Sequence, residues 1–145
     1  MIDLRTATYG LTILRVSLGV MFVSHAWLKY GVFTMPGFAG FLGQVGLPAA
    51  LAWPIVLAEF AGGLALIIGI QARLVSVALL PILLGALMIH WPNGWVFNAK
   101  NGGWEYPAFL IVAQITHILA GDGAFALKPS SLPLLGRNER LVAAE

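Results

Sequence analysis

The stretch that decides the fold is AWPIVLAEFAGGLALIIGIQAR, residues 52–73. It holds about twenty nearly continuous apolar residues, which is the length a helix needs to cross a bilayer. One carboxylate, Glu59, lies well inside it. A charged side chain at that depth costs at least about 2.5 kcal/mol to insert, so we expect Glu59 to face partners or water rather than lipid. Gly62 and Gly63 share that helical face, where a neighbouring backbone can approach closely.

The composition of the whole chain indicates that most of it is solvated by lipid. Of its 145 residues, 59% are hydrophobic and 10% are charged, and the mean hydropathy is +0.88. A soluble domain has about 25% charged residues, and one of this length cannot bury so much apolar surface. The net charge of +2 comes from scattered cations, which excludes a nucleic-acid-binding protein. The absence of cysteine excludes disulfides, thiol redox chemistry and Cys-ligated metal or iron–sulfur centres.

Four apolar segments predict four membrane-spanning helices, at about residues 9–30, 49–70, 74–90 and 105–120. Residues 31–48 are apolar but rich in glycine, which favours an interfacial or re-entrant segment with a short helix. Residues 71–73 predict a tight turn. We therefore predict an all-α membrane protein, an up-and-down four-helix bundle with an interfacial or re-entrant segment after the first helix. Residues 1–127 form the membrane domain, and residues 128–145 a polar tail.

The distribution of cations predicts the orientation in the membrane. Positive residues favour the cytoplasmic side, where this topology places the N-terminus, the turn at residues 71–73 and the tail, including Arg137 and Arg140. The opposite side carries only Lys29 and Lys100. We therefore expect a multi-pass protein of the plasma membrane with both termini in the cytoplasm. An aromatic belt is expected near the outer face, formed by Trp27, Trp53, Trp91, Trp95 and Trp104.

Several polar side chains are predicted to converge at the outer mouth of the bundle, above Glu59. His25 and Lys29 lie one turn apart on one face of the first helix. So many titratable groups exceed what a passive bundle requires, which indicates a functional site. The predicted catalytic residues are His25, Glu59, His90 and Glu105, and the predicted ligand-binding residues are Arg15, Phe22, Trp27, Lys29, Trp91 and Asn93.

Each of these residues also has a structural interpretation. Arg15 and Glu59 would form an ion pair that pins two helices together, and His25 would bind a loop carbonyl. His90 and Glu105 suit helix ends, and Lys29 suits an interfacial position. A metal site of His25, Glu59, His90 and Glu105 has no HExxH or ExxH pair to support it, so no metal is predicted. Two inner-end residues are expected to link helices rather than form a site, namely Gln114 and His117.

Three segments resemble the DoxX family of small bacterial and archaeal membrane proteins. They are LRVSLGVMFVSHAWLKY at residues 14–30, AEFAGGLALIIGIQAR at 58–73, and HWPNG at 90–94 followed by NGGWEY at 101–106. The resemblance runs from about Leu14 to Leu127. It implies a four-span protein related to subunits of quinol oxidation and thiosulfate:quinone oxidoreduction. Other members are linked to redox-stress or thiol-stress assemblies with soluble partners.

The residues and the resemblance together predict a redox-associated membrane protein that binds a quinone-like or other amphiphilic molecule at the outer mouth. If it is an enzyme, it is expected to be a subunit of a quinone-linked oxidoreductase with a soluble or membrane redox partner. One alternative is a non-enzymatic anchor for a soluble redox or stress partner, in which the polar residues only hold helices together. Another is a small-solute transporter. A homo-oligomer is compatible with each of them.

Overall fold

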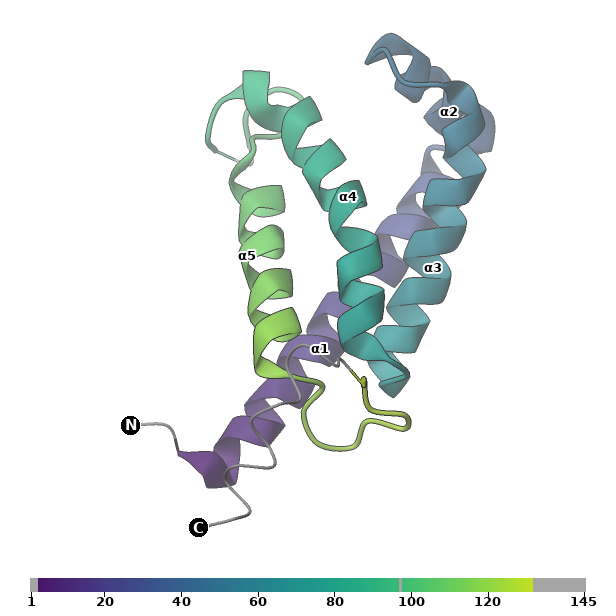
Figure 1. The fold of residues 1–145 in the computed structure, drawn as a ribbon. Helices are drawn as coiled ribbons and strands as arrows, with labels where there is room; N and C mark the ends of the chain where they lie inside the picture. Colours follow the sequence, from purple (N-terminus) through teal and green to yellow (C-terminus); the bar gives the residue numbers. More distant parts are fainter. Residues whose placement is uncertain (1–2, 97, 132–145) are drawn as a thin grey trace.

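The computed structural model describes residues 3–96 and 98–131, and the described chain is helical throughout apart from its loops (Figure 1). The one bridge among these residues is an isolated parallel pair between Ile70 and Lys128. The prediction of an all-α fold is therefore confirmed. The elements in order are α1 (Leu4–Trp27), the π-helix η1 (Leu28–Val32), α2 (Met35–Gln44), the short 3-10 helix η2 (Ala49–Leu51), α3 (Ala52–Ile68), α4 (Ala72–His90), the 3-10 helix η3 (Trp91–Asn93) and α5 (Glu105–Ala120).

Three continuous helical segments among the described residues are long and apolar enough to cross a membrane: Arg5–Val32, Ala49–Ile68 and Ala72–Asn93. The chain is therefore a multi-pass membrane protein. The helix α5 occupies the predicted position of the fourth span, but its 16 residues extend only about 24 Å, which is less than a typical hydrocarbon core of about 30 Å. The 10-residue helix α2 lies in the segment predicted to be interfacial or re-entrant.

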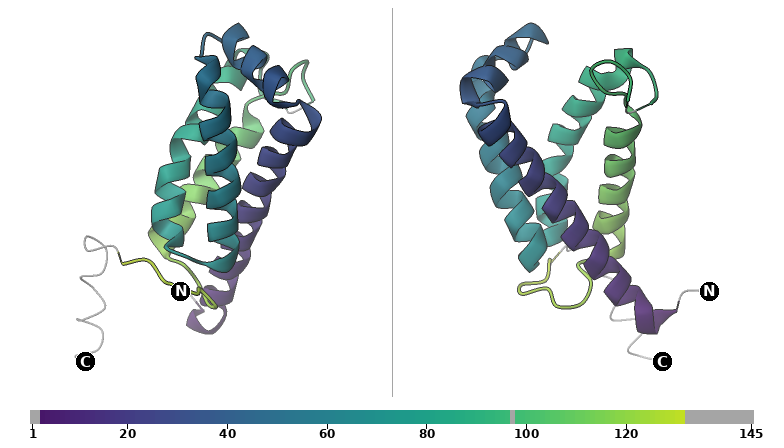
Figure 2. Two further views of the ribbon diagram at one scale, coloured as in Figure 1. Left: turned by 90° about the vertical axis from the view of Figure 1, so that its right-hand side faces the viewer. Right: turned by 180° about the vertical axis from the view of Figure 1, so that it is seen from behind.

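The four longest described helices form two antiparallel pairs, α1 with α3 and α4 with α5 (Figures 1 and 2). The pairs join through contacts of α3 with α4 and of α1 with α5. They diverge toward the end that carries α2 and residues 94–104, which we call the loop end. The opposite end, which carries residues 69–71 and 121–131, is called the turn end. The helix α2 packs on α3 and on η1, at the loop end of the first pair.

Local signals set the ends of the helices. The Asp3 carboxylate accepts a hydrogen bond of 3.0 Å from the Arg5 amide, which caps α1 and starts it earlier than residue 9. The predicted turn at residues 71–73 is displaced by two residues. Gly69 ends α3 in the left-handed region with φ of 75°, Gln71 follows with φ of 46°, and α4 then begins.

The close contact between α1 and α3 depends on two glycines that face one another. A β-carbon on Gly63 would lie 2.8 Å from the Gly19 carbonyl oxygen, and one on Gly19 would lie 2.6 Å from the Gly63 carbonyl oxygen. Small residues of this kind let the backbones of membrane helices approach closely. The predicted role of the Gly62–Gly63 pair as a packing surface agrees with this geometry, since Gly62 lies against Leu79 of α4.

The substitution Gly63→Ala is expected to destabilise the protein by about 1–3 kcal/mol, because the added methyl group forces two backbones apart. The matched control is Gly85→Ala in the spanning helix α4, where a β-carbon would meet no atom within 4 Å. Thermal unfolding in detergent, followed by circular dichroism, measures both variants. Equal midpoints for Gly63→Ala and Gly85→Ala would contradict the packing described here.

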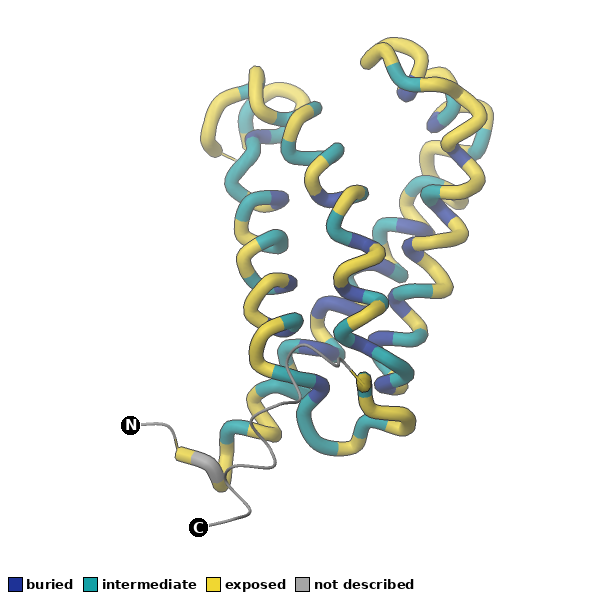
Figure 3. The backbone as a smooth tube through the Cα atoms, viewed as in Figure 1, coloured by how far each residue is buried: buried dark blue, intermediate teal, exposed yellow. Residues whose placement is uncertain are grey.

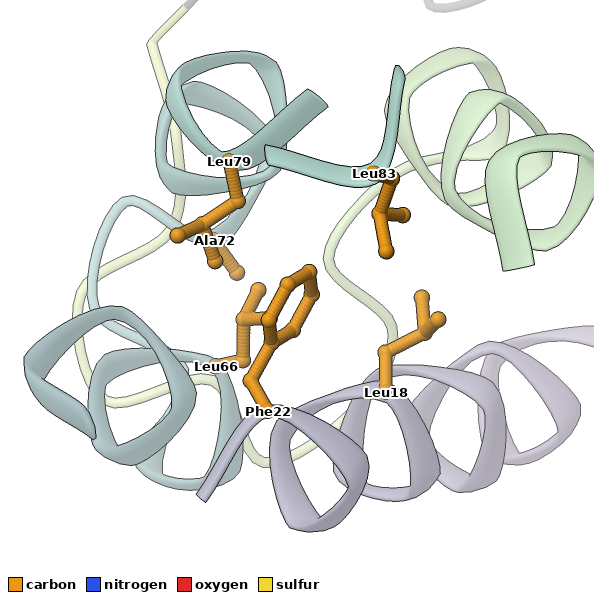
Figure 4. Close-up of a cluster of buried hydrophobic side chains, with 6 residues drawn as sticks. All are labelled: Leu18, Phe22, Leu66, Ala72, Leu79 and Leu83. Carbon is orange, nitrogen blue, oxygen red and sulfur yellow. The ribbon is translucent and has the colours of Figure 1, made fainter. Parts of the chain in front are cut away.

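Buried apolar side chains join α1, α3 and α4 in one cluster (Figure 4). Buried residues line the inward faces of the helices, and the outward faces are exposed (Figure 3). The exposed faces carry large apolar side chains such as Ile13, Leu57, Met88 and Phe109. An outward apolar surface of this extent is typical of helices solvated by lipid. The buried cluster comprises Leu18, Phe22, Leu66, Ala72, Leu79 and Leu83.

Residues 121–131 pack across the turn end. The Asp122 carboxylate accepts hydrogen bonds from the Arg73 amide at 3.1 Å and the Ser130 amide at 2.5 Å. The Lys128 amide donates to the Gly69 carbonyl, and the Lys128 carbonyl accepts from the Gln71 amide. The first part of the predicted tail, residues 128–131, is therefore hydrogen-bonded to the bundle. Residues 132–145, with Arg137 and Arg140, lie outside the described part of the chain.

Candidate functional site at the loop end

The loop-end half of the bundle holds an ion pair between the Lys29 ammonium and the Glu59 carboxylate. Within this pair, Lys29 Nζ donates a hydrogen bond to Glu59 Oε1. Glu59 is only 3% exposed, and it lies seven residues into α3 from the loop end, a depth of about 10 Å. Burial removes most of the hydration of both ions, so the pair replaces water that the carboxylate would otherwise need. The sequence-based expectation that Glu59 faces a partner rather than lipid agrees with this contact.

The position of Lys29 depends on an unusual piece of backbone. It lies in the π-helix Leu28–Val32, which extends α1 and closes with a hydrogen bond of 2.9 Å from the Phe33 amide to the Leu28 carbonyl. The π-helix is rare, and its wider turn changes the direction in which the following side chains point. The Lys29 ammonium also lies 5.5 Å from the centre of the Phe38 ring of α2. A carboxylate and an aromatic face thus hold one cation.

His25 is the second predicted site residue near Glu59, with which it interacts electrostatically. Its Nδ1 lies 2.7 Å from the Met21 carbonyl oxygen, so Nδ1 carries a proton that it donates there. In the neutral ring, Nε2 is then a hydrogen-bond acceptor. The His25 ring stacks on Tyr106 of α5 at 5.8 Å between centroids. The structural interpretation of His25 expected a loop carbonyl, whereas its partner is the Met21 carbonyl one turn earlier in α1, and this bond leaves Nε2 available.

One oxygen of the Glu59 carboxylate has no hydrogen-bond partner among the described residues. This oxygen, Oε2, is fully buried, while Oε1 accepts from Lys29. A buried carboxylate oxygen without a donor is costly, and such an atom calls for a physical explanation. The loop-end site, which we define as His25, Lys29, Glu59 and Tyr106, therefore offers an ammonium donor, an unpaired carboxylate oxygen and an imidazole nitrogen.

Arg15 does not belong to this site, and the predicted Arg15–Glu59 ion pair is not formed. The Arg15 guanidinium is 1% exposed and points to the turn end. There Nη1 donates to the carbonyls of Leu66 at 2.9 Å and Ile67 at 3.2 Å, and Nη2 donates to the Ala124 carbonyl at 3.2 Å. Arg15 thus donates to two of the last carbonyls of α3, of which the Leu66 carbonyl also accepts from the Gly69 amide at 3.2 Å. Leu66 is seven residues, about two turns, from Glu59.

His90 and Asn93 hold the loop between α4 and α5. The His90 Nδ1 lies 3.1 Å from the carbonyl oxygens of both Asn101 and Gly102. The Asn93 amide donates to the same two carbonyls, at 3.2 and 2.9 Å. Both side chains therefore hold the backbone at Asn101 and Gly102, and no hydrogen bond or ion pair joins either of them to Glu59 among the described residues.

The residues of the predicted aromatic belt form two groups of ring contacts at the loop end. Trp91 stacks on Trp104 at 4.7 Å between centroids, and Trp95 meets Trp104 edge-on at 4.5 Å. Trp27 contacts Tyr30, which in turn contacts Trp53. Trp27, Trp53, Trp91 and Trp95 are exposed, as expected of residues at a membrane interface.

The remaining two predicted residues lie in different surroundings. Phe22 is buried in the apolar cluster of α1, α3 and α4 (Figure 4), one turn below Ala26 on the inward face of α1. Glu105 begins α5, and its amide donates a hydrogen bond of 3.1 Å to the Trp95 carbonyl. The helix start suits its negative charge. Within residues 3–96 and 98–131, no three or more His, Cys, Asp and Glu side chains are grouped so that they could hold a metal ion.

Tyr106 and the Lys29–Glu59 pairing are the parts of the site that sequence reasoning missed. Tyr106 follows Glu105 at the start of α5, where only the antiparallel contact with α1 brings it to His25. The pairing had a usable signal, since an acid inside a membrane helix needs a cation at similar depth on a neighbouring helix. Lys29, near the same end of the preceding helix, meets that condition.

Comparisons with known proteins found a family model and a relative that match this chain. The family model described as DoxX matches residues 10–91. A protein of Bacillus subtilis (strain 168) with the name "Putative oxidoreductase CatD" is 31% identical over 121 residues, which cover 83% of this chain and 85% of that protein. No solved structure matches the chain.

Proposed function

The chain belongs to the DoxX family, and on that premise we propose that it is a redox-associated membrane protein that binds a quinone-like amphiphile at the loop-end site. The observation that carries the proposal is the buried Lys29–Glu59 pair with its unpartnered Glu59 Oε2. The name of the Bacillus subtilis relative, "Putative oxidoreductase CatD", supports a redox role.

The chemistry of a quinone headgroup fits the donors and acceptors of this site. A quinone offers carbonyl oxygens that accept hydrogen bonds, and a quinol offers hydroxyl groups that donate them. The Lys29 ammonium can donate to a carbonyl, while Glu59 Oε2 and His25 Nε2 can accept from hydroxyls. Tyr106 and Phe38 supply aromatic surfaces next to these groups, and the lipid phase accommodates an isoprenoid tail.

Electron transfer requires a second component in this proposal. The chain has no cysteine, so it holds neither a dithiol couple nor a Cys-ligated iron–sulfur cluster. Electrons would pass between the bound quinone and a partner subunit or a cofactor that this partner carries. The role assigned to His25, Lys29 and Glu59 is to bind the headgroup and to exchange its protons.

The same proposal assigns a topology. We place α5 across the membrane as a fourth span beside α1, α3 and α4, with α2 at the interface. The turn end, which holds Arg5, Arg73 and Lys128, faces the cytoplasm, and the loop end faces the opposite side of the plasma membrane. The packing of α5 against both α4 and α1 supports this placement, since a helix in that position shares the depth of its neighbours.

The binding proposal is tested by titrating the purified protein in detergent with decylubiquinone and with menadione, while tryptophan fluorescence is recorded. Loss of a charge-assisted hydrogen bond costs about 1.5–3 kcal/mol, so Glu59→Gln is expected to weaken binding by roughly 10- to 150-fold. The double variant Lys29→Met/Glu59→Leu removes both charges together, and is expected to bind neither compound while remaining folded.

Lys100→Met is the matched control, because it removes an exposed cation of the loop and should leave binding unchanged. Absence of quinone binding by the wild-type protein would end the proposal. Unchanged binding by the folded double variant would place the quinone elsewhere. In either case, a Lys29–Glu59 pair that contributes only to stability would favour the alternative of a non-enzymatic membrane anchor.

A further inference from the structure

A second buried polar cluster lies toward the turn end, between α4 and α5. The side chains of Ser76, Gln114 and His117 are all fully buried. The Gln114 Nε2 donates to the Ser76 carbonyl at 2.6 Å, and the Ser76 hydroxyl lies 2.9 Å from the His117 Nδ1. These contacts join α4 to α5, as expected for Gln114 and His117 from the sequence.

The cluster has polar atoms that these contacts leave unused. The His117 Nε2 and the Gln114 Oε1 are both buried without a hydrogen-bond partner among the described residues. The orientation of the Gln114 amide follows from its contact, since the Ser76 carbonyl requires the nitrogen as its donor. A third unpartnered atom, the Arg15 Nε, belongs to a guanidinium that interacts electrostatically with His117.

Leaving these buried polar atoms without hydrogen bonds would destabilise the folded protein. Each buried donor or acceptor without a partner costs about 1–3 kcal/mol. Buried polar groups in folded proteins are therefore satisfied by protein atoms or by ordered water, and isolated exceptions are few. Two unpartnered atoms on side chains one helical turn apart, both against Ser76, do not look like independent exceptions.

We propose that Ser76, Gln114 and His117 form a hydrated site inside the bundle, in which bound water completes the hydrogen bonds of Gln114 Oε1 and His117 Nε2. The required ligand must donate to an amide oxygen. It must also fit His117 whichever ring nitrogen holds the proton, because the Ser76 hydroxyl can either donate to Nδ1 or accept from it. Water both donates and accepts hydrogen bonds, and it is the smallest ligand that does so beside side chains as fully covered as these three.

The surrounding charges also favour a polar ligand at this place. Asp122, Arg15 and Arg73 all interact electrostatically with His117. The carboxylate of Asp122 is held by Arg73 and Ser130, and the two guanidinium groups are held by carbonyls of α3, α5 and Ala124. These charges are therefore fixed in position. The hydrated site lies toward the turn end and Glu59 lies in the loop-end half of the bundle. The test of the hydrated site is therefore independent of the test of quinone binding.

Magnetic resonance of histidine in lipid nanodiscs tests this inference. The chain contains three histidines, so ¹⁵N-histidine labelling gives three ring systems that His25→Gln and His90→Gln variants assign. The expected result is a water-to-ring proton correlation at His117 although this residue is fully buried. Absence of that correlation at His117, in a sample where half-buried His25 shows one, would overturn the inference.

Gln114→Met supplies the second measurement, because methionine keeps the volume of the side chain and removes both its acceptor oxygen and the nitrogen that donates to Ser76. The water correlation of His117 is expected to be lost in this variant while the His25 and His90 signals stay at their wild-type positions. Retention of the full correlation would show that the amide oxygen does not hold the water. The matched control is Gly85→Ala, which changes the neighbouring helix at a position with open space.

Discussion

Lys29→Met is expected to lower the free energy of unfolding by about 3–5 kcal/mol, because it leaves the buried Glu59 carboxylate without its cation. Methionine retains the length and apolar contacts of the lysine side chain, so the change removes charge rather than volume. Equilibrium unfolding in mixed detergent micelles with increasing SDS measures the effect. Lys100→Met controls for the loss of a positive charge, since Lys100 is exposed in the loop between α4 and α5.

The double variant Lys29→Met/Glu59→Leu distinguishes the loss of the ion pair from the cost of a buried carboxylate that has no cation. Replacing both ions of a buried pair by apolar residues is often neutral or stabilising. We therefore expect the double variant to recover most of the stability that Lys29→Met loses. If Lys29→Met were as stable as the wild-type protein, the pair would have to be hydrated, and Glu59 would not be the buried group described here.

Arg15→Met is expected to cost about 1–3 kcal/mol, because it leaves the Ile67 carbonyl without its donor. The carbonyls of Leu66 and Ala124 lose one of two donors, since they also accept from the Gly69 amide and the Thr12 hydroxyl. Arg15→Lys keeps the charge but not the planar guanidinium that reaches α3 and Ala124 together, so an intermediate loss is expected. SDS unfolding measures stability, and hydrogen exchange at residues 123–126 reports whether the turn end has loosened.

Arg5→Met is the matched control on the same helix. Arg5 is exposed, so its replacement should change stability by no more than about 0.5 kcal/mol. If Arg15→Met were equally mild, the guanidinium would contribute nothing to the closure of the turn end. A loss of stability without faster exchange at residues 123–126 would assign the effect to the end of α3 alone.

The helices were predictable from sequence because membrane thickness imposes a minimum apolar length. The predicted spans at residues 49–70 and 74–90 each differ by two residues at one end from η2 with α3 and from α4. The turn was displaced because Gly69 and Gln71 adopt left-handed conformations before Ala72 starts the next helix. The spans predicted at residues 74–90 and 105–120 leave a loop between α4 and α5, but its hydrogen bonds to His90 and Asn93 depend on the path of its backbone.

The partners of the charged residues were harder to predict, because they depend on how α1 and α3 slide past one another. The contact of Gly19 with Gly63 sets this register, and it places Arg15 beside the end of α3 rather than beside Glu59. Sequence reasoning identified Gly63 as a contact position without pairing it with Gly19. The π-helix that carries Lys29 has no simple sequence signal, so its effect on the direction of Lys29 emerges only in the structure.

The carbonyls that hold Arg15 also determine when its hydrogen bonds can form during synthesis of the chain. Arg15 enters the membrane with the first helix, whereas Leu66 follows 51 residues later and Ala124 follows 109 residues later. At about 5–20 residues per second, a ribosome needs roughly 5–20 s to supply the last of them. During that interval the guanidinium must be sheltered by water or by the insertion machinery. The hydrogen bonds of Arg15 can therefore be completed only after nearly the whole chain has been made.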